Sequence, residues 1–205
     1  MKAFIILPLI GAAMLSHGQV VLDQSLASPH TGGFNINEGF SSVGQVFTAG
    51  LSGSLAGVNI AIQSQSIYPL HVAIRGVTAG VPDSAVLGET TLAQSAVSLD
   101  YLITFPQTIP MTAGVQYAIV VDYVGAPPPG AGHGQGAWEE AYGMDYYPAG
   151  SPVEFNGNNW VQDSSGDLLF QTFVQTVPEP STTALLAAAS VPTLIRFVRS
   201  RKKTL

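Results

Sequence analysis

The feature that most constrains the fold of this chain is a repeated alternation of large apolar residues with polar or small ones. Successive side chains of a β-strand point to opposite faces, so a period of two predicts half-buried strands. The large apolar residues of four such runs are Val58, Ile60 and Ile62; Leu70, Val72 and Ile74; Tyr101, Ile103 and Phe105; and Tyr117, Ile119, Val121 and Tyr123. Because no internal segment sustains a helical period with caps, we expect strands throughout the central part of the chain.

Segments rich in Gly, Pro, Asn and Asp separate these runs and predict turns. They are residues 76–83, 106–114, 125–136 and 147–152. Asn156-Gly157 predicts a two-residue hairpin between short apolar segments, and residues 167–174 predict a single, largely buried strand. Short strands at this spacing predict an all-β domain, an antiparallel β-sandwich of jelly-roll-like topology.

Charge is distributed very unevenly along the sequence. Residues 19–176 hold twelve of the thirteen acidic residues but only one of the seven basic residues, Arg75, which gives this segment a formal charge of −11. Such a surface repels nucleic acid, so nucleic acid is excluded as a partner. The chain has no cysteine, which excludes a thiol nucleophile, a redox pair and a thiolate metal site. The segment is long enough to fold as a single domain with its own core.

Residues 1–18 have the composition of a secretory signal peptide. Lys2 precedes a short apolar run, which ends in the small residues Ser16 and Gly18 at the positions that suit cleavage before Gln19. The alternative is a buried N-terminal helix or strand, which an internal proline and glycine disfavour. We therefore expect a signal helix that is removed on export.

The C-terminal end carries three features in order: Pro178-Glu179-Pro180, an uncharged run over residues 182–195, and a basic cluster. As a helix the run is about 21 Å long, against about 30 Å of hydrocarbon in a bilayer. It can form a short transmembrane helix if it extends past Arg196, whose side chain reaches toward the headgroups. The basic residues are Arg196, Arg199, Arg201, Lys202 and Lys203. By the positive-inside rule they hold the C-terminus in the cytoplasm, which places residues 19–176 outside.

This three-part tail resembles the PEP-CTERM sorting signal, with Val177, Pro178, Glu179 and Pro180 at the motif. The resemblance covers residues 177–205 and implies recognition by an exosortase, a membrane-embedded cysteine-type transpeptidase. That enzyme would remove the tail and pass the protein to the cell envelope or its polysaccharide. With the signal peptide and the Sec machinery it implies an exported, extracellular protein, anchored in the membrane transiently or permanently by its C-terminal helix. An ordinary C-terminal anchor is the alternative.

The central segment is similar to the choice-of-anchor domains of exported proteins. The matching residues are 44–50 (GQVFTAG), 51–55 (LSGSL), 80–82 (GVP), Leu87, 90–92 (TTL), Phe105, 111–119 (MTAGVQYAI) and 167–173 (DLLFQTF). The resemblance implies a jelly-roll-like domain without an assigned activity, and it supplies no catalytic residues.

Catalytic arrangements are weakly supported, and we expect no enzyme. After signal cleavage the candidate bases are His30, His71 and His133, and no Gly-x-Ser-x-Gly elbow is present. His71 lies on the strand face opposite Leu70 and Val72. Glu139-Glu140 is the obvious cluster for a carbohydrate-cleaving pair of carboxylates. Adjacent strand residues point to opposite faces, so we interpret these two as solvated acids.

Two ligand classes remain as hypotheses. Aromatic side chains can stack on sugar rings, and five of them gather in one part of the sequence, although core packing explains them about as well. They are Trp138, Tyr142, Tyr146, Tyr147 and Trp160. Asp163 and Asp167 flank a tight turn and are the candidate calcium ligands, although unliganded surface acids are the preferred interpretation and we expect no cofactor.

The sequence thus predicts a non-enzymatic structural or adhesive domain of the cell envelope, with exopolysaccharide as its candidate ligand. A carbohydrate-active enzyme and a calcium-stabilised scaffold are the alternatives.

Overall fold

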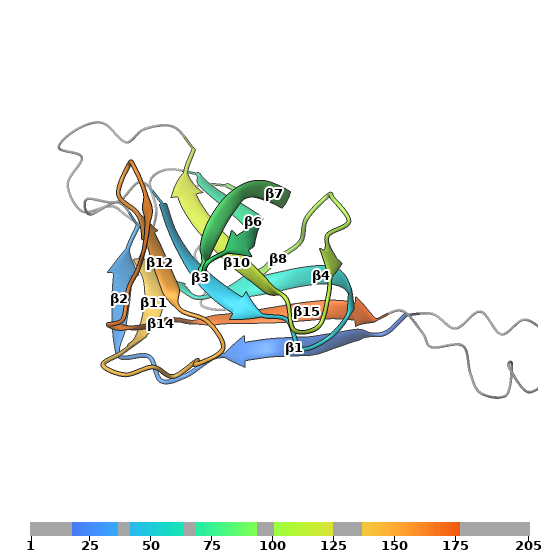
Figure 1. Ribbon diagram of the computed structural model, residues 1–205, viewed down its shortest axis with the longest axis horizontal. Helices are drawn as coiled ribbons and strands as arrows, with labels where there is room; N and C mark the ends of the chain where they lie inside the picture. Colours follow the sequence, from blue (N-terminus) through green and yellow to red (C-terminus); the bar gives the residue numbers. More distant parts are fainter. Residues whose placement is uncertain (1–17, 37–41, 64–68, 94–100, 125–136, 177–205) are drawn as a thin grey trace, which may run out of the picture. The chain divides into compact units, whose positions relative to one another are not determined.

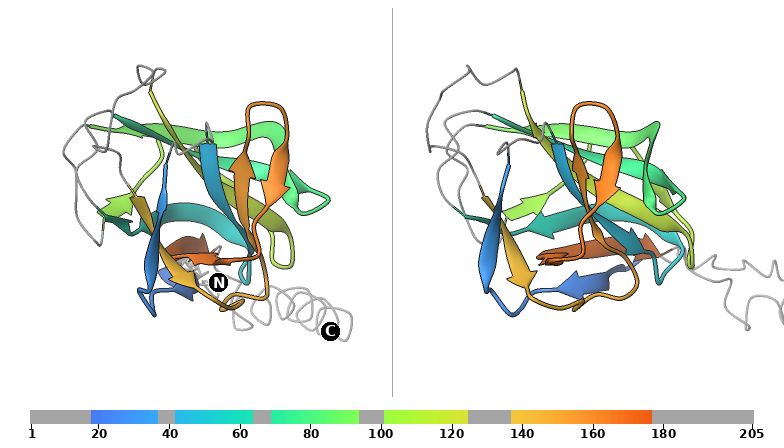
Figure 2. Two further views of the ribbon diagram at one scale, coloured as in Figure 1. Left: turned by 90° about the vertical axis from the view of Figure 1, so that its left-hand side faces the viewer. Right: turned by 60° about the vertical axis from the view of Figure 1, so that its left-hand side comes forward.

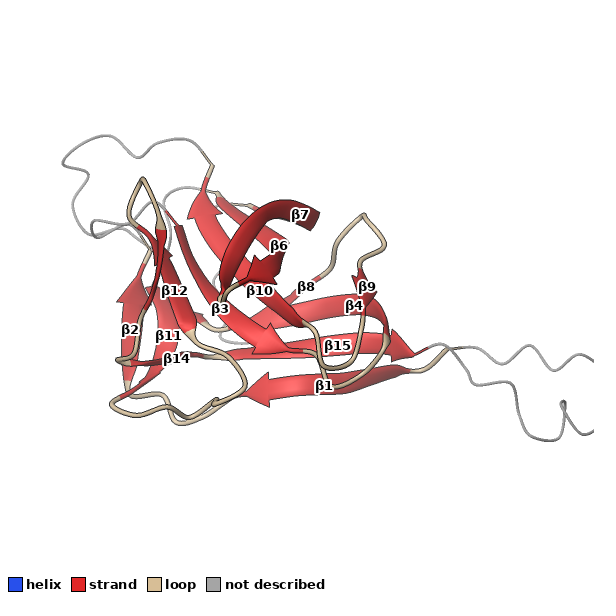
Figure 3. Ribbon diagram, in the orientation of Figure 1, coloured by secondary structure: helices blue, strands red, loops and turns tan. Residues whose placement is uncertain are grey.

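The computed structural model describes residues 18–36, 42–63, 69–93, 101–124 and 137–176, and this part of the chain is all-β, without a helix (Figure 3). Its strands are β1 (Val20–Leu26), β2 (Gly32–Asn35), β3 (Ser42–Thr48), β4 (Gly53–Ile60), β5 (Ile62–Gln63), β6 (Leu70–Thr78), β7 (Val81–Leu92), β8 (Tyr101–Ile103), β9 (Pro110–Met111), β10 (Gln116–Tyr123), β11 (Ala137–Tyr142), β12 (Pro152–Phe155), β13 (Trp160–Gln162), β14 (Gly166–Leu168) and β15 (Phe170–Thr176). Residues Gln19–Val177 form one compact unit.

The strands form three antiparallel sheets (Figure 1). A six-stranded sheet has the order β13-β12-β3-β10-β6-β7. A five-stranded sheet has the order β1-β15-β4-β8, with β9 also paired to β4. In the four-stranded sheet, β11 lies between β14 and β2 and also pairs with β5. The prediction of an all-β domain with antiparallel strands is therefore confirmed.

The four period-two runs form strands, as predicted: they lie in β4 and β5, in β6, in the edge strand β8 and in β10. Tyr117, Ile119 and Val121 of β10 point into the main core together with Val72 and Ile74 of the neighbouring strand β6. Burying a large apolar side chain stabilises a fold by about 1.5–3 kcal/mol, which is why the alternation fixes the inward face of each strand.

The six-stranded and five-stranded sheets face each other across this core (Figure 2). The ring of Phe47 in β3 lies 5.8 Å from the ring of Phe170 in β15. Phe170 also receives the edge of the Tyr147 ring at 5.1 Å. Aromatic side chains from both sheets therefore join the two layers at their centre.

The other face of the six-stranded sheet carries a smaller apolar cluster. Val46, Ala118, Val120 and Val153 are buried there, and Trp160 packs against them. The sheet is curled enough that its two edges touch: Gln162 Nε2 in β13 donates to the carbonyl oxygen in the β6–β7 turn at 3.0 Å. The curl explains why both faces of β10 are apolar.

The prediction of one strand over residues 167–174 is wrong. β14 ends at Leu168 in the four-stranded sheet, and β15 begins at Phe170 in the five-stranded sheet. Leu168, Leu169 and Phe170 are all buried, so the apolar run continues without a break while the chain passes from one sheet to the other at Leu169.

The hairpins also differ from the predictions. β12 and β13 form the predicted hairpin, but four residues connect them, because Asn156 Oδ1 accepts the backbone N–H groups of Asn158 and Asn159 at 3.0 Å each. The two-residue hairpin lies instead at Ala79-Gly80, within the predicted turn, where φ is +53° and +80°. Two positive φ values are those of a type I′ turn.

Several predicted segments cannot be compared with the structure. The predicted turn at residues 125–136, the sorting tail and, apart from Gly18, the signal peptide lie outside the described residues.

Candidate functional site

Strand β11 positions four of the side chains that the sequence singles out: Trp138, Glu139, Glu140 and Tyr142. It is the central strand of the four-stranded sheet, with Trp138 opposite Phe34 of β2 and Glu140 opposite Leu168 of β14. Residues 137–141 are all buried. A strand covered on both faces cannot present its side chains to a large ligand, which sets the roles of the residues on it.

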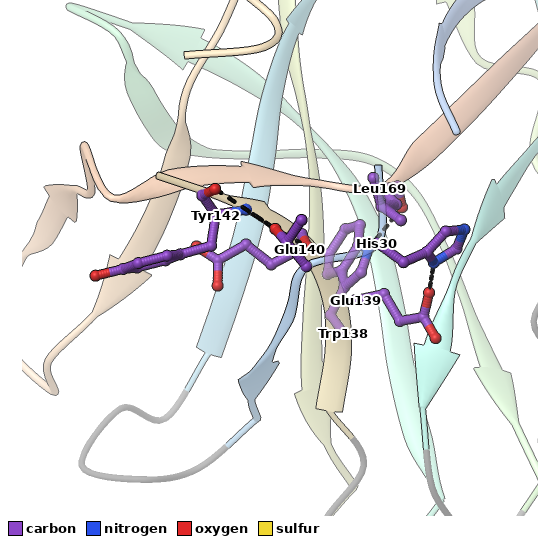
Figure 4. A network of polar contacts seen from close by, with 7 residues as sticks. His30, Trp138, Glu139, Glu140, Tyr142 and Leu169 are labelled. Atoms are coloured by element: carbon purple, nitrogen blue, oxygen red, sulfur yellow. Dashed lines mark hydrogen bonds and ion pairs between the residues drawn. The ribbon is translucent and has the colours of Figure 1, made fainter. Parts of the chain in front are cut away.

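Trp138 is a core residue, so the hypothesis that it contacts sugar is wrong. Its exposed fraction is 0%, and its indole Nε1–H donates to the Leu169 carbonyl oxygen at 2.7 Å (Figure 4). The bond holds the crossing point between β14 and β15 against β11. A buried indole that has its polar partner inside the protein is typical of a structural tryptophan.

The other four aromatic side chains of this set do not form one platform either. Tyr147 is buried, and its hydroxyl donates to Gln24 Oε1 at 2.8 Å; burial raises the pKa of this hydroxyl to about 12. Tyr146 is partly buried against the main core, and Trp160 packs on Phe155 with 5.3 Å between ring centroids. Tyr142, at the end of β11, is exposed.

Glu139 and Glu140 leave β11 in opposite directions (Figure 4). Both are buried, with exposed fractions of 3% and 5%, so their interpretation as solvated acids is wrong. Glu139 Oε2 contacts His30 Nδ1, whereas Glu140 Oε1 accepts from Ser165 Oγ at 3.2 Å. Each carboxylate has a partner inside the domain, which is how a folded chain tolerates a buried acid.

Asp163 and Asp167, the candidate calcium ligands, are held by donors of the protein. Asp163 accepts from the backbone N–H and the hydroxyl of Ser165, at 2.9 and 2.6 Å. Asp167 Oδ2 accepts two backbone N–H groups, from Tyr146 and Tyr147, at 2.9 Å each. Asp167 is also buried rather than at the surface, and burial raises the pKa of its carboxyl group despite these bonds.

Among the residues that the structure describes, no three His, Asp or Glu side chains are grouped so as to hold a metal ion. Burial raises the pKa of Glu140, and the nearby charges of Asp163 and Asp167 raise it further.

His71 lies between two carboxylates on the solvent side of the six-stranded sheet. Its Nδ1 is 3.1 Å from Asp122 Oδ1 on β10, and its Nε2 is 3.1 Å from Glu89 Oε2 on β7. These contacts join three neighbouring strands, and we infer that they stabilise the pairing of those strands. His133 lies outside the described residues.

A pocket of about 180 Å³ opens beside His30. Its polar lining is His30 from the β1–β2 loop, Asn59 from β4 and Gln171 from β15. Its apolar lining is Leu26, Ala27, Ile60, Ala61, Leu169 and Phe170. Sequence reasoning singled out His30 only as a candidate base and missed this site, because its polar residues come from three distant segments and share no motif.

The residues of the predicted sorting signal cannot be compared with the structure. Val177, Pro178, Glu179, Pro180, Arg196, Arg199, Arg201, Lys202 and Lys203 lie outside the described residues. Within the described ranges, no helix is long and apolar enough to cross a bilayer.

A scan against protein-family models found no match, and a search of curated proteins found no similar sequence.

Proposed function

We propose that this chain is an exported protein of the cell envelope, sorted by an exosortase, in which residues 19–176 form a non-enzymatic structural or adhesive module. The Sec machinery and the exosortase are its partners during export, and exopolysaccharide is its ligand at the surface. The signal-peptide composition of residues 1–18 and the three-part tail over residues 177–205 support this route.

The observation that carries the proposal is the pairing of the first and last strands of the domain. The backbone N–H of Thr176 donates to the carbonyl oxygen of Gln19 at 3.0 Å, and Val20 pairs with Gln175 (Figure 1). Cleavage before Gln19 and processing at residues 177–180 would therefore leave every strand of the domain intact. Both cuts would fall at one end of one sheet.

For the fold we propose the finer description of a jelly-roll-like β-sandwich. Two sheets face each other across one core, and the chain passes between sheets in successive strands, such as β3 to β4. Jelly rolls occur in viral capsid and lectin domains, which are structural and sugar-binding modules.

The non-enzymatic role is favoured over a carbohydrate-active enzyme by the placement of the acids. Glycosidases need two carboxyl groups that flank the scissile glycosidic bond, about 5–5.5 Å apart in retaining enzymes and about 6.5–9.5 Å apart in inverting ones, where a water molecule must also fit. Glu139 and Glu140 instead lie on opposite faces of one strand, and each has a partner within the domain.

The proposal is tested by expressing the full chain in a bacterium with and without an exosortase. We expect mature protein that starts at Gln19 in both strains, and loss of the C-terminal segment only where the exosortase is present. Replacing Pro178, Glu179 and Pro180 by alanine should abolish that processing. Replacing Pro127, Pro128 and Pro129, three residues of the central segment, is the matched control and should not.

Terminal sequencing, intact mass and cell fractionation read out the result. Chain that keeps Met1 and stays in the cytosol, or a tail removed equally well from the alanine variant, would contradict the proposal.

A further inference from the structure

We propose that the pocket beside His30 binds one sugar ring of a neutral saccharide through Asn59, Gln171 and His30. The inference rests on the proposed adhesive function, for which it names a site and a ligand class. It replaces the aromatic cluster, whose members are buried or spread apart, as the place where the domain meets polysaccharide.

The polar side of the pocket is a row of amides that crosses three strands. Asn59 Nδ2 donates to Gln171 Oε1 at 3.0 Å, and Gln171 Nε2 donates to Ser25 Oγ of β1 at 3.2 Å. These bonds fix the orientation of both amides before any ligand arrives. A fixed polar group loses little side-chain freedom on binding, which favours recognition of a small ligand.

One acceptor in this row has no partner. Asn59 Oδ1 is buried, and no described residue donates a hydrogen bond to it. A buried acceptor without a donor costs free energy, so such atoms are rare unless a ligand or water supplies the donor. A hydroxyl group bound in the pocket would satisfy this oxygen once the Asn59 amide turned toward it, because the oxygen has almost no accessible surface in the unbound domain.

His30 supplies a second acceptor. Its Nδ1 contacts the buried Glu139 carboxylate (Figure 4), and when the ring is neutral with its proton on Nδ1, Nε2 has a lone pair that can accept a hydrogen bond. The His30 side chain is half exposed, at 50%. Two acceptors on separate segments, β4 and the β1–β2 loop, suit a ligand that offers two hydroxyl donors.

The rest of the lining matches the C–H face of a sugar ring. Six of the nine lining residues are apolar, and their surface can cover ring carbons while the hydroxyl groups reach the amides and the imidazole. No Lys, Arg, Asp or Glu lines the pocket, and the surrounding domain is strongly acidic. An anionic saccharide would meet an unfavourable field, so the ligand is neutral.

The test titrates the purified full chain with glucose, galactose and mannose at millimolar concentrations. A zwitterionic detergent without a sugar headgroup keeps the chain soluble and does not compete. Saturation-transfer NMR reports transfer from the protein to ring C–H protons. We expect binding of at least one of these sugars, and no transfer to glucuronate under the same conditions.

Three variants locate the site. Asn59→Leu and His30→Ala should each weaken binding about tenfold, the effect of losing one hydrogen bond of ordinary strength. Gln171→Ala should weaken it as well. Gln175→Ala is the matched control, because Gln175 lies on the same strand and the same sheet face but outside the pocket, and should bind like the unmodified chain.

Thermal unfolding of each variant checks that the domain is folded. The proposal is overturned if no neutral sugar binds, or if folded Asn59→Leu and His30→Ala bind as well as the control. The export experiment and the sugar titration have independent outcomes. A correctly sorted chain that binds no sugar refutes this site alone. A chain that binds sugar but is never exported refutes the proposed function alone.

Discussion

Gln45 and Asp167 join two sheets through a buried hydrogen bond, in which Gln45 Nε2 donates to Asp167 Oδ1 at 3.2 Å. Gln45 lies on β3 of the six-stranded sheet and Asp167 on β14 of the four-stranded sheet, and both are almost fully buried. Gln45 Oε1 also accepts the backbone N–H of Leu168 at 2.8 Å. The pair therefore orders the junction of the sheets, which the apolar core alone would leave free to slide.

Replacing Gln45 by methionine, which has a similar size, should lower the free energy of unfolding by about 1–3 kcal/mol. The Leu168 N–H and the Asp167 oxygen would remain buried without their partner. Chemical denaturation measures the loss. Gln175→Met, at an exposed site, is the control and should change stability by less than about 0.5 kcal/mol. Equal effects of the two substitutions would show that the buried pair contributes nothing.

The strands that could be predicted are those with one clear inward face, such as β4 and β6. Where both faces are covered, the pattern loses its information. The apolar run through Leu168, Leu169 and Phe170 is continuous, so nothing in it marks the crossing between sheets at Leu169. The buried hydrogen bond of Gln45 could not be predicted from the sequence either, because its partner Asp167 is 122 positions away.

Trp138 and Tyr142 test the reassignment of the aromatic cluster. Trp138→Ala should lower the free energy of unfolding by about 3–5 kcal/mol, because it empties a site in the core. Tyr142→Ala, only four positions away on the same strand but exposed, should change it by less than about 0.5 kcal/mol. Urea denaturation of both variants decides the matter, and a stable, folded Trp138→Ala protein would contradict the structural role.

The candidate site could not be predicted for a related reason. His30 and Glu139 are 109 positions apart, and Asn59 and Gln171 are 112 apart, so no motif or spacing connects them. Their residue types are common in loops and on strand surfaces. Only the register of β4 against β15 places Asn59 opposite Gln171.

Mild acid should stabilise the domain. Burial raises the pKa of several carboxyl groups above their ordinary values of 3.8 for Asp and 4.5 for Glu; they are Asp23, Asp122, Glu140, Glu154 and Asp167. A raised pKa means that the folded chain binds these protons more tightly than the unfolded chain. The protonated carboxyl groups therefore add to the free energy of unfolding in full below the ordinary pKa values, and this stabilisation is lost as pH rises through the folded-state pKa values. The melting temperature should therefore fall as pH rises from about 4 toward neutrality.

Glu140→Gln separates this effect from the overall charge of the domain. The amide cannot ionise but can still accept from Ser165, so the variant should melt at a higher temperature than the unmodified chain at neutral pH. Its melting temperature should also depend less on pH. A control at an exposed acid, Asp145→Asn, changes the net charge equally; it only weakens one contribution to the raised pKa of Asp167, so it should change the slope less than Glu140→Gln does. A domain that loses stability on acidification would contradict the prediction.

The β6–β7 turn offers a stabilising substitution. Ala79 adopts φ +53° at an exposed position of a two-residue turn, where an L-residue with a β-carbon is strained by about 1–2 kcal/mol. Asparagine tolerates this region better, so Ala79→Asn should raise the free energy of unfolding by roughly 0.5–1 kcal/mol. Ala79→Val should lower it, because a β-branched side chain is least compatible with positive φ. Urea denaturation measures both substitutions. If asparagine brings no gain, the turn has another conformation than the one described here, in which it accepts a hydrogen bond from Gln162. A stabilising valine would rule out the positive φ at position 79.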